Sequence, residues 1–189
     1  DAEYASADSF RDTVYNKTLI VSPQLLWRPG ERTTIRLKGE YVHDHSKPDY
    51  GIPSFEGRPA KVPISTYYGE PFDNQESDQI NAVLSAEHHF DENWLVRGGL
   101  SYYRLGYSDD TKDTFNSWTD GATLNRYYEN FPKWDAYKTA QIEAVGKFGT
   151  FGLRHTLLLG AEYDIHDMDY GKNYIVGALE SPIDIFNPV

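Results

Sequence analysis

The sequence predicts an all-β fold, in which an antiparallel sheet of long strands forms a segment of a transmembrane β-barrel. Three observations lead to this fold class. Segments of about ten residues alternate between apolar and polar side chains, which is the period of a β-strand and the length that crosses a bilayer. Aromatic side chains mark both ends of the apolar faces. The connections between segments are alternately very short and very long.

The alternation predicts seven strands. Within one of them, Ile80, Ala82 and Leu84 share one face, while the opposite face carries Asn81 and Glu87. The same pattern recurs along the chain, and the strands expected from it run roughly over residues 2–9, 18–28, 33–44, 79–90, 94–106, 137–147 and 154–167.

Aromatic residues distinguish a barrel in lipid from a soluble sandwich, because both show alternation. Large rings lie near one set of strand ends, and tyrosines lie seven or eight residues away on the same apolar faces; the first set is Trp27, Trp94 and Phe148, and the second is Tyr41, Tyr102 and Tyr163. Two aromatic girdles around an aliphatic band about 25 Å tall are typical of an outer-membrane barrel.

The connections predict the orientation of the strands. Residues 29–32 and 91–93 form tight turns rich in Pro, Gly, Asp and Asn, whereas the stretches 45–77, 108–136 and 167–189 are long. Outer-membrane barrels have short periplasmic turns and long extracellular loops. We therefore expect the long loops to face the medium.

Composition excludes several classes of function. The chain has 189 residues, a net charge of -11 and no cysteine. An acidic balance argues against nucleic acid as a partner, since phosphate binding needs clustered Lys and Arg. Because no activated nucleophile or phosphate-binding glycine loop accompanies the carboxylates, we expect no enzyme activity and no cofactor. We also expect no metal site, since strand alternation separates Asp44 from His43 and His45. The segment 109–113 carries several carboxylates but is interpreted as a solvated loop tip.

An odd number of strands does not close a bacterial barrel, which has an even number and at least eight. We therefore expect residues 1–189 to be part of a single, larger barrel domain whose remaining strands are not in this chain.

Short motifs in a consistent order carry a resemblance over nearly the whole chain. They include Pro48-Asp49-Tyr50-Gly51-Ile52-Pro53, Gly57-Arg58-Pro59, Glu87-His88-His89-Phe90, His155-Thr156-Leu157-Leu158-Leu159-Gly160 and Ile183-Asp184-Ile185-Phe186-Asn187-Pro188. In these motifs the sequence resembles TonB-dependent siderophore receptors.

The resemblance implies a 22-stranded barrel filled by a plug domain. It implies ferric siderophore as the ligand, bound from outside and imported with TonB-supplied energy, so that iron enters only with the ligand. The partners expected are the siderophore, the TonB complex acting through a plug that these residues lack, and outer-membrane lipid with lipopolysaccharide. Gly57-Arg58-Pro59 and Tyr68-Gly69 lean toward catecholate receptors by resemblance only.

Ligand contacts are expected from aromatic side chains in the loops and at the outer end of the inward face, because rings offer large contact area and polar tips. The candidates are Tyr67, Tyr68, Tyr103, Trp118, Tyr127, Tyr128 and Trp134. The alternative for the loop residues is that they pack the loops against each other. The inward charges Arg36, Glu87, Arg97 and Glu143 either meet a plug or pair across strands.

Two other functions remain open at this stage. A passive porin-like channel shares the alternation and the loops, and a plug domain ahead of Asp1 distinguishes a receptor from it. A soluble β-sandwich binding module shares the alternation alone, and partition into detergent distinguishes the barrel from it.

Overall fold

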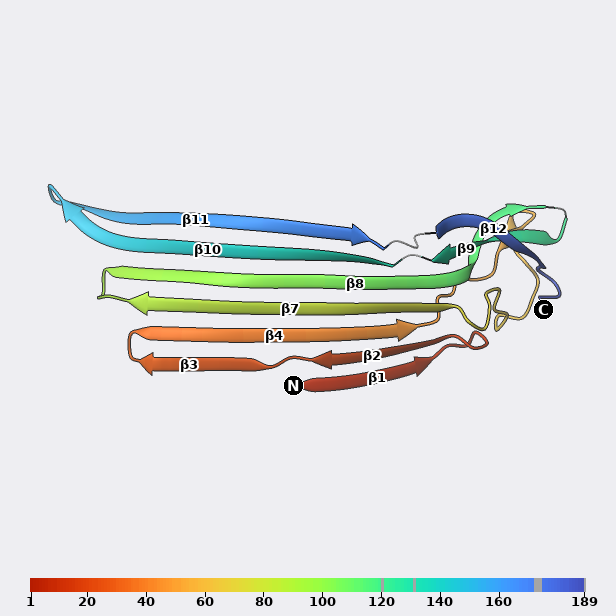
Figure 1. The fold of residues 1–189 in the computed structure, drawn as a ribbon, viewed down its shortest axis with the longest axis horizontal. Helices are drawn as coiled ribbons and strands as arrows, with labels where there is room; N and C mark the ends of the chain where they lie inside the picture. The colour runs from red at the N-terminus through yellow and green to blue at the C-terminus, as the bar shows by residue number, and fades with distance from the viewer. Residues whose placement is uncertain (120, 131, 172–174, 189) are drawn as a thin grey trace.

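The computed structural model describes residues 1–119, 121–130, 132–171 and 175–188, except for the side chains of residues 112–117, 127 and 175–181. It shows one open antiparallel sheet of long strands, with tight turns at one end and a body of loops at the other (Figure 1). No helix among these residues is long and apolar enough to span a membrane.

The sheet follows the order β1-β2-β4-β7-β8-β10-β11. Its members are β1 (Ala2–Asp8), β2 (Tyr15–Val21), β3 (Gln24–Gly30), β4 (Thr33–Ser46), β7 (Asn74–His89), β8 (Trp94–Trp118), β10 (Lys133–Thr150) and β11 (Leu153–Tyr170), with β3 paired to β4. The loop end adds β5 (Ser54–Phe55), β6 (Arg58–Pro59), β9 (Thr123–Asn130) and β12 (Ile175–Asp184).

The strand expected over residues 18–28 is interrupted, yet it remains one pass across the sheet. Val21 pairs with Tyr41 and Gln24 pairs with Lys38, so the register on β4 is unchanged across the gap. Pro23 has no N–H to donate, but its carbonyl oxygen accepts from the Gly39 N–H at 2.9 Å. With β2 and β3 counted as one pass, all seven predicted strands are confirmed.

All three predicted long loops contain strands: the short pair β5 and β6 lies within 45–77, and longer strands correct the expectation for residues 108–136 and 167–189. Strand β8 continues past Gly106 to Trp118, β9 returns beside it, and β12 pairs with β9. The sequence 107–113 is polar on both faces, so alternation stops there. Backbone hydrogen bonds do not depend on that alternation, and the ladder continues without it.

The register sorts the side chains into two faces. One rung contains Leu37, Leu84, Leu100, Ala140 and Tyr163, side by side on five strands. The adjacent rung, on the opposite face, contains Arg36, Ser85, Gly99, Gln141 and Glu162. We call the first face the outward face and the second the inward face.

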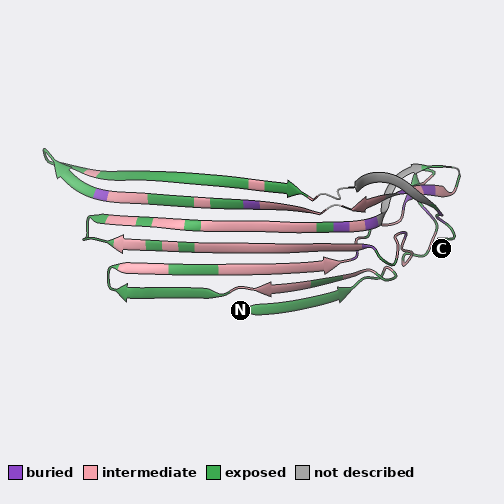
Figure 2. Cartoon of the chain, in the orientation of Figure 1, coloured by how far each residue is buried: buried purple, intermediate pink, exposed green. Residues whose placement is uncertain are grey.

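Burial is concentrated at the loop end, as Figure 2 shows. On the outward face Leu37, Leu84 and Leu100 are 46%, 41% and 57% exposed. The buried apolar cluster consists instead of Ala60, Tyr68, Leu124, Ile183 and Ile185. A single-layer sheet has nothing packed on either face, so its apolar face requires lipid as its surroundings.

Candidate functional site

Charged side chains line the turn-side half of the inward face. Glu87, Arg97 and Glu143 face each other on three neighbouring strands. The Arg97 Nε donates to Glu143 Oε2 at 2.6 Å, and Glu87 Oε1 lies 2.9 Å from His89 Nε2. In this structure the pairing across strands therefore accounts for Arg97 and Glu143. Both side chains are well exposed, so the pair contributes little to stability.

Three rings form a row nearer the loops on the inward face. Tyr103, Tyr137 and His166 are register partners on β8, β10 and β11. The Tyr137 and His166 rings stack with centroids 4.1 Å apart at 5°, and the Tyr103 centroid lies 6.2 Å from that of Tyr137. Tyr137 is 47% exposed, so the row offers open ring surface. We call these three residues the aromatic row.

Polar groups border the aromatic row. The Tyr103 hydroxyl lies 3.5 Å from Gln79 Oε1, and His166 Nε2 lies 3.4 Å from Asp135 Oδ1. Sequence reasoning named Tyr103 but missed Tyr137 and His166. Alternation within each strand places Tyr137 and His166 on the polar face. Their alignment with Tyr103 depends on the register between strands, which the sequence alone does not give.

Two predicted ligand residues lie in the 47–73 segment. Tyr68 is 2% exposed, and its hydroxyl donates to the Ile185 carbonyl oxygen at 2.9 Å. The Tyr67 hydroxyl donates to Asp73 Oδ2 at 2.8 Å, and the Lys47 ammonium lies 5.3 Å from its ring centroid. The structure thus places Tyr68 in loop packing, the alternative left open by the sequence, and leaves Tyr67 only partly buried.

The other predicted ligand residues are dispersed. Trp118 is 40% exposed and contacts Phe55 edge-on, with ring centroids 5.5 Å apart. Trp134 lies in β10 on the outward face, where the Arg104 guanidinium is 5.6 Å from its ring centroid. Tyr128 is partly buried on β9, and the Tyr127 side chain lies outside the described residues. The predicted set therefore does not form one cluster.

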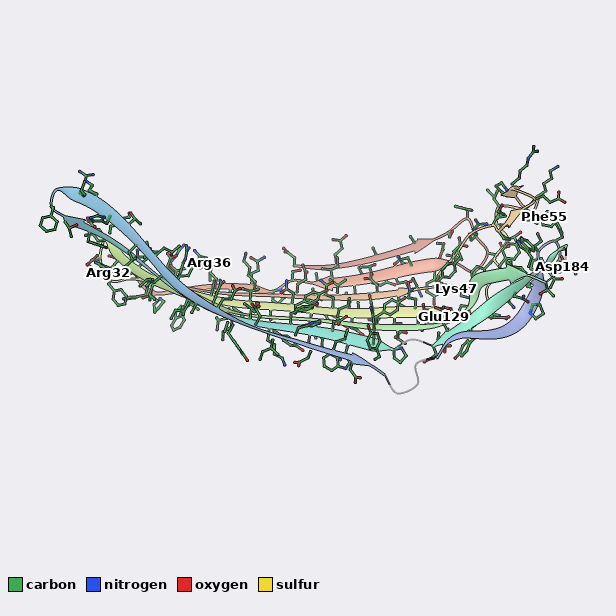
Figure 3. All side chains as sticks on the ribbon, turned by 90° about the horizontal axis from the view of Figure 1, so that it is seen from above. Arg32, Arg36, Lys47, Phe55, Glu129 and Asp184 are labelled. Carbon is green, nitrogen blue, oxygen red and sulfur yellow. The ribbon has the colours of Figure 1, made fainter. Side chains whose placement is uncertain are left out.

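Polar contacts join the loops into one body. Arg126 on β9 is 3% exposed; it donates to the Tyr68 carbonyl oxygen and to Glu70 Oε1, each at 2.7 Å. The Arg11 Nε donates to Asp49 Oδ2 at 2.8 Å. Figure 3 shows Lys47, Phe55, Glu129 and Asp184 together at this end, far from Arg32 and Arg36. We call residues 9–14, 47–73, 107–119, 121–130 and 183–188 the loop body.

The segment 109–113 is not the solvated tip that the sequence predicted, at least at its first residues. Asp109 is 5% exposed and Thr111 is fully buried, because β7 and β9 flank this part of β8 and Asp73 lies nearby. Burial, and then the nearby Asp73 and Asp110 carboxylates, raise the pKa of Asp109. Burial and Asp109 likewise raise the pKa of Glu129, and burial with Asp109 raises the pKa of Tyr107 to about 12.

Buried oxygens remain unpaired in this region. Asn74 Oδ1, Asp109 Oδ1, Asp110 Oδ1 and Thr111 Oγ1 have no hydrogen-bond partner in the described part of the chain. Nevertheless, no three His, Asp or Glu side chains in that part are grouped so as to hold a metal ion. The aromatic row offers ring surface and polar groups at the inward face.

A family model described as "TonB dependent receptor-like, beta-barrel" matches residues 24–188. The chain belongs to this family. The proteins of the family are transporters of the bacterial outer membrane, not enzymes. The soluble sandwich is thereby excluded.

Curated relatives match most of this chain, but the chain matches only part of each relative. The metal-pseudopaline receptor CntO of Pseudomonas aeruginosa is 31% identical over 95% of the chain, and the catecholate siderophore receptor Fiu of Escherichia coli K12 is 25% identical over 96%. The chain spans 26% and 27% of these two relatives.

Solved structures show the same fold. The open form of E. coli Fiu matches with a TM-score of 0.79 at 19% identity, over 100% of this chain and 32% of that one. The siderophore receptor PiuA of Acinetobacter baumannii matches with a TM-score of 0.74 at 18% identity, over 100% and 31%.

Proposed function

We propose that this chain forms part of the barrel wall of a receptor that binds ferric siderophore from outside and imports it with energy supplied through TonB. The names of the relatives support this proposal, since CntO receives metal–pseudopaline, Fiu receives catecholate siderophores and PiuA is a siderophore receptor. Their names share one property: each refers to a small organic chelator that carries a metal.

The aromatic row is the observation that carries the proposal for this chain. Three rings stand side by side on the inward face, directly below the loop body, and Tyr137 is half exposed. Flat arms of a chelator stack on such rings, and the hydroxyl and imidazole groups hydrogen-bond to its polar edges. We propose Tyr103, Tyr137 and His166 as ligand contacts.

Loop aromatics supply a second set of proposed contacts. Tyr67 and Trp118 keep accessible ring surface and are retained, together with Tyr127 and Tyr128 on β9. Tyr68 acts instead by holding the loop body together through Ile185. Trp134 faces outward and is withdrawn from the set.

Binding to the complete receptor in detergent tests the proposal. Tryptophan fluorescence is followed during titration with ferric catecholate, ferric hydroxamate and metal–pseudopaline complexes. Saturable quenching by one ferric class is the expected result. Quenching by the pseudopaline complex alone would favour a metallophore other than a ferric siderophore, in line with the 31% identity to CntO. The absence of quenching by every complex would refute both.

Neighbouring tyrosines provide a matched pair of variants. Tyr103 points inward and Tyr102 points outward. Replacing Tyr103 by Ala should raise the Kd about three- to tenfold, the range of one lost aromatic contact. Replacing Tyr102 by Ala should leave the Kd unchanged. Equal effects would place the ligand elsewhere.

A further inference from the structure

The charge of the inward face changes along the strands. On the turn side of the aromatic row, cations and carboxylates occur in similar numbers. The register places Arg36, Lys38, Arg97, Lys147 and Arg154 on this part of the face, together with Glu87, Glu143, Glu162 and Asp164. Arg97 and Glu143 form an ion pair there. The turn-side half of the inward face is therefore close to neutral.

Between the aromatic row and the loop body the inward face is acidic. The described strands place one Lys or Arg side chain there, which is Lys133. The carboxylates of this part of the face, which we call the acidic rim, are Glu3, Glu40, Asp44 and Asp135. Glu40 belongs to the rung of the aromatic row, since it pairs with Asn81, and Asn81 pairs with Tyr103.

The acidic rim is not neutralised by basic side chains of the described residues. None of its carboxylates has a Lys or Arg nitrogen within 4.0 Å. Asp44 Oδ1 accepts from the Thr18 hydroxyl at 2.6 Å, and Asp135 Oδ1 lies 3.4 Å from His166 Nε2. A hydroxyl and an unprotonated imidazole carry no charge, so the rim remains negative.

The acidic rim stands beside the ligand contacts proposed above. Glu40 lies two strands from Tyr103 in the same rung, which is about 10 Å at ordinary strand spacing. Asp135 contacts His166, and its side chain is only 21% exposed. Charges that are partly buried and this close are weakly screened by salt. An anionic ligand on the aromatic row is therefore repelled, whereas a neutral ligand is not.

We propose that the acidic rim selects a ferric complex without net negative charge, so that the ligand class is a ferric hydroxamate and not a ferric catecholate. This inference rests on the proposed function, because it takes the aromatic row as the ligand contact. Fe³⁺ held by dianionic catecholates is strongly negative, whereas Fe³⁺ held by singly charged hydroxamates is neutral. Like charge that repels a competing ligand is a source of specificity.

The charge of the rim opposes the resemblance in two short motifs. Gly57-Arg58-Pro59 and Tyr68-Gly69 lean toward catecholate receptors. Tyr68 is buried in loop packing, however, so its motif describes how the loop body is held together. The rim carboxylates lie beside open ring surface, so the charge of the ligand acts on them directly.

Equilibrium binding to the complete receptor in detergent tests the inference. The probes are a ferric trihydroxamate and a ferric tricatecholate of similar size, each titrated at low and at high salt. We expect the hydroxamate complex to bind about tenfold tighter or more at low salt, and this ratio to fall as salt screens the rim.

Variants of single carboxylates separate the charge of the rim from its shape. Glu40→Gln should tighten binding of the catecholate complex about two- to fivefold at low salt, and should change binding of the hydroxamate complex much less. Asp135→Asn should act in the same direction. Glu162→Gln provides the matched control, since it removes the same charge from the same face on the turn side of the aromatic row. It should change neither affinity.

The outcomes distinguish this inference from the proposed function. Binding of the catecholate complex as tightly as the hydroxamate complex, or more tightly, would overturn the inference and leave the siderophore receptor standing. A ratio that does not vary with salt would also overturn it, as would equal responses to Glu40→Gln and Glu162→Gln, because the charge of the rim would then not determine the preference. Binding of neither complex would overturn both proposals.

Discussion

The sheet and the loop body are stabilised in different ways. The sheet is one layer thick, and its leucines are about half exposed on the outward face. Its order comes from the backbone ladder and, in the membrane, from lipid around that face. The loop body instead has a small buried core around Tyr68 and Ile185, with a buried arginine crossing it. Loops that carry their own core present a preformed surface rather than a set of independent flexible strands.

The largest expected effect comes from removing the arginine that joins the loops. Arg126→Ala leaves Glu70 and the Tyr68 carbonyl oxygen without their donor, which should destabilise the loop body by about 3 kcal/mol. The measurement is the rate of limited proteolysis in the 47–73 segment of the folded receptor. Arg97→Ala, on the exposed wall, should cost less than about 1 kcal/mol and leave that rate unchanged. Equal rates in both variants would mean that the loop body lacks a common core.

On the sheet, the largest effect is expected from a charge placed on the outward face. Leu158 and Leu159 are 59% and 61% exposed, so the chain alone hardly distinguishes them, but the register places Leu159 outward. Leu159→Arg should therefore cost about 2 to 4 kcal/mol in lipid at the bilayer midplane, and Leu158→Arg much less. Reversible folding into vesicles, followed by denaturant titration, measures both. A reversed order would exchange the two faces.

Much of the sheet could be predicted from the sequence, because the alternation within each strand determines which side chains share a face. Tyr102 and Tyr103 differ by one residue, and alternation alone assigns them to opposite faces. The aromatic row was not predictable in the same way, since the placement of His166 beside Tyr137 depends on the register between β10 and β11. Register comes from the pairing of whole strands, which a single segment does not contain.

The loop body was the hardest part to predict. Asp109 has a polar sequence around it, and nothing in 107–113 indicates that β9 and Asp73 lie beside it. Tyr68 was predicted as a ligand contact because rings offer contact area and polar tips, and the structure places it in loop packing, the alternative that the sequence left open. Burial at both positions arises from contacts between segments far apart in the sequence, such as Tyr68 and Ile185.

A smaller effect is expected at the hydroxyl that joins those two segments. Tyr68→Phe keeps the buried ring but removes the donor to the Ile185 carbonyl oxygen, at a cost of about 1 kcal/mol. Hydrogen exchange at the amides of residues 183–187 measures it, because opening of this segment should become more frequent. Ile185→Val provides a matched control for core packing, which should change protection through volume alone. Unchanged exchange in Tyr68→Phe would show that water satisfies the carbonyl oxygen.

The smallest effect has the opposite sign and depends on pH. Burial raises the pKa of Asp109, so the folded loop body favours its protonated form. The stability due to this group is complete below the ordinary carboxyl pKa and is lost as the pH rises through the raised one. Asp109→Asn removes the titration and supplies donors beside unpaired oxygens, so it should stabilise the loop body at neutral pH. Its advantage, measured by proteolysis, should shrink as the pH falls toward 4; an advantage that does not vary with pH would mean that Asp109 is already neutralised by a bound cation or is solvated in the intact receptor.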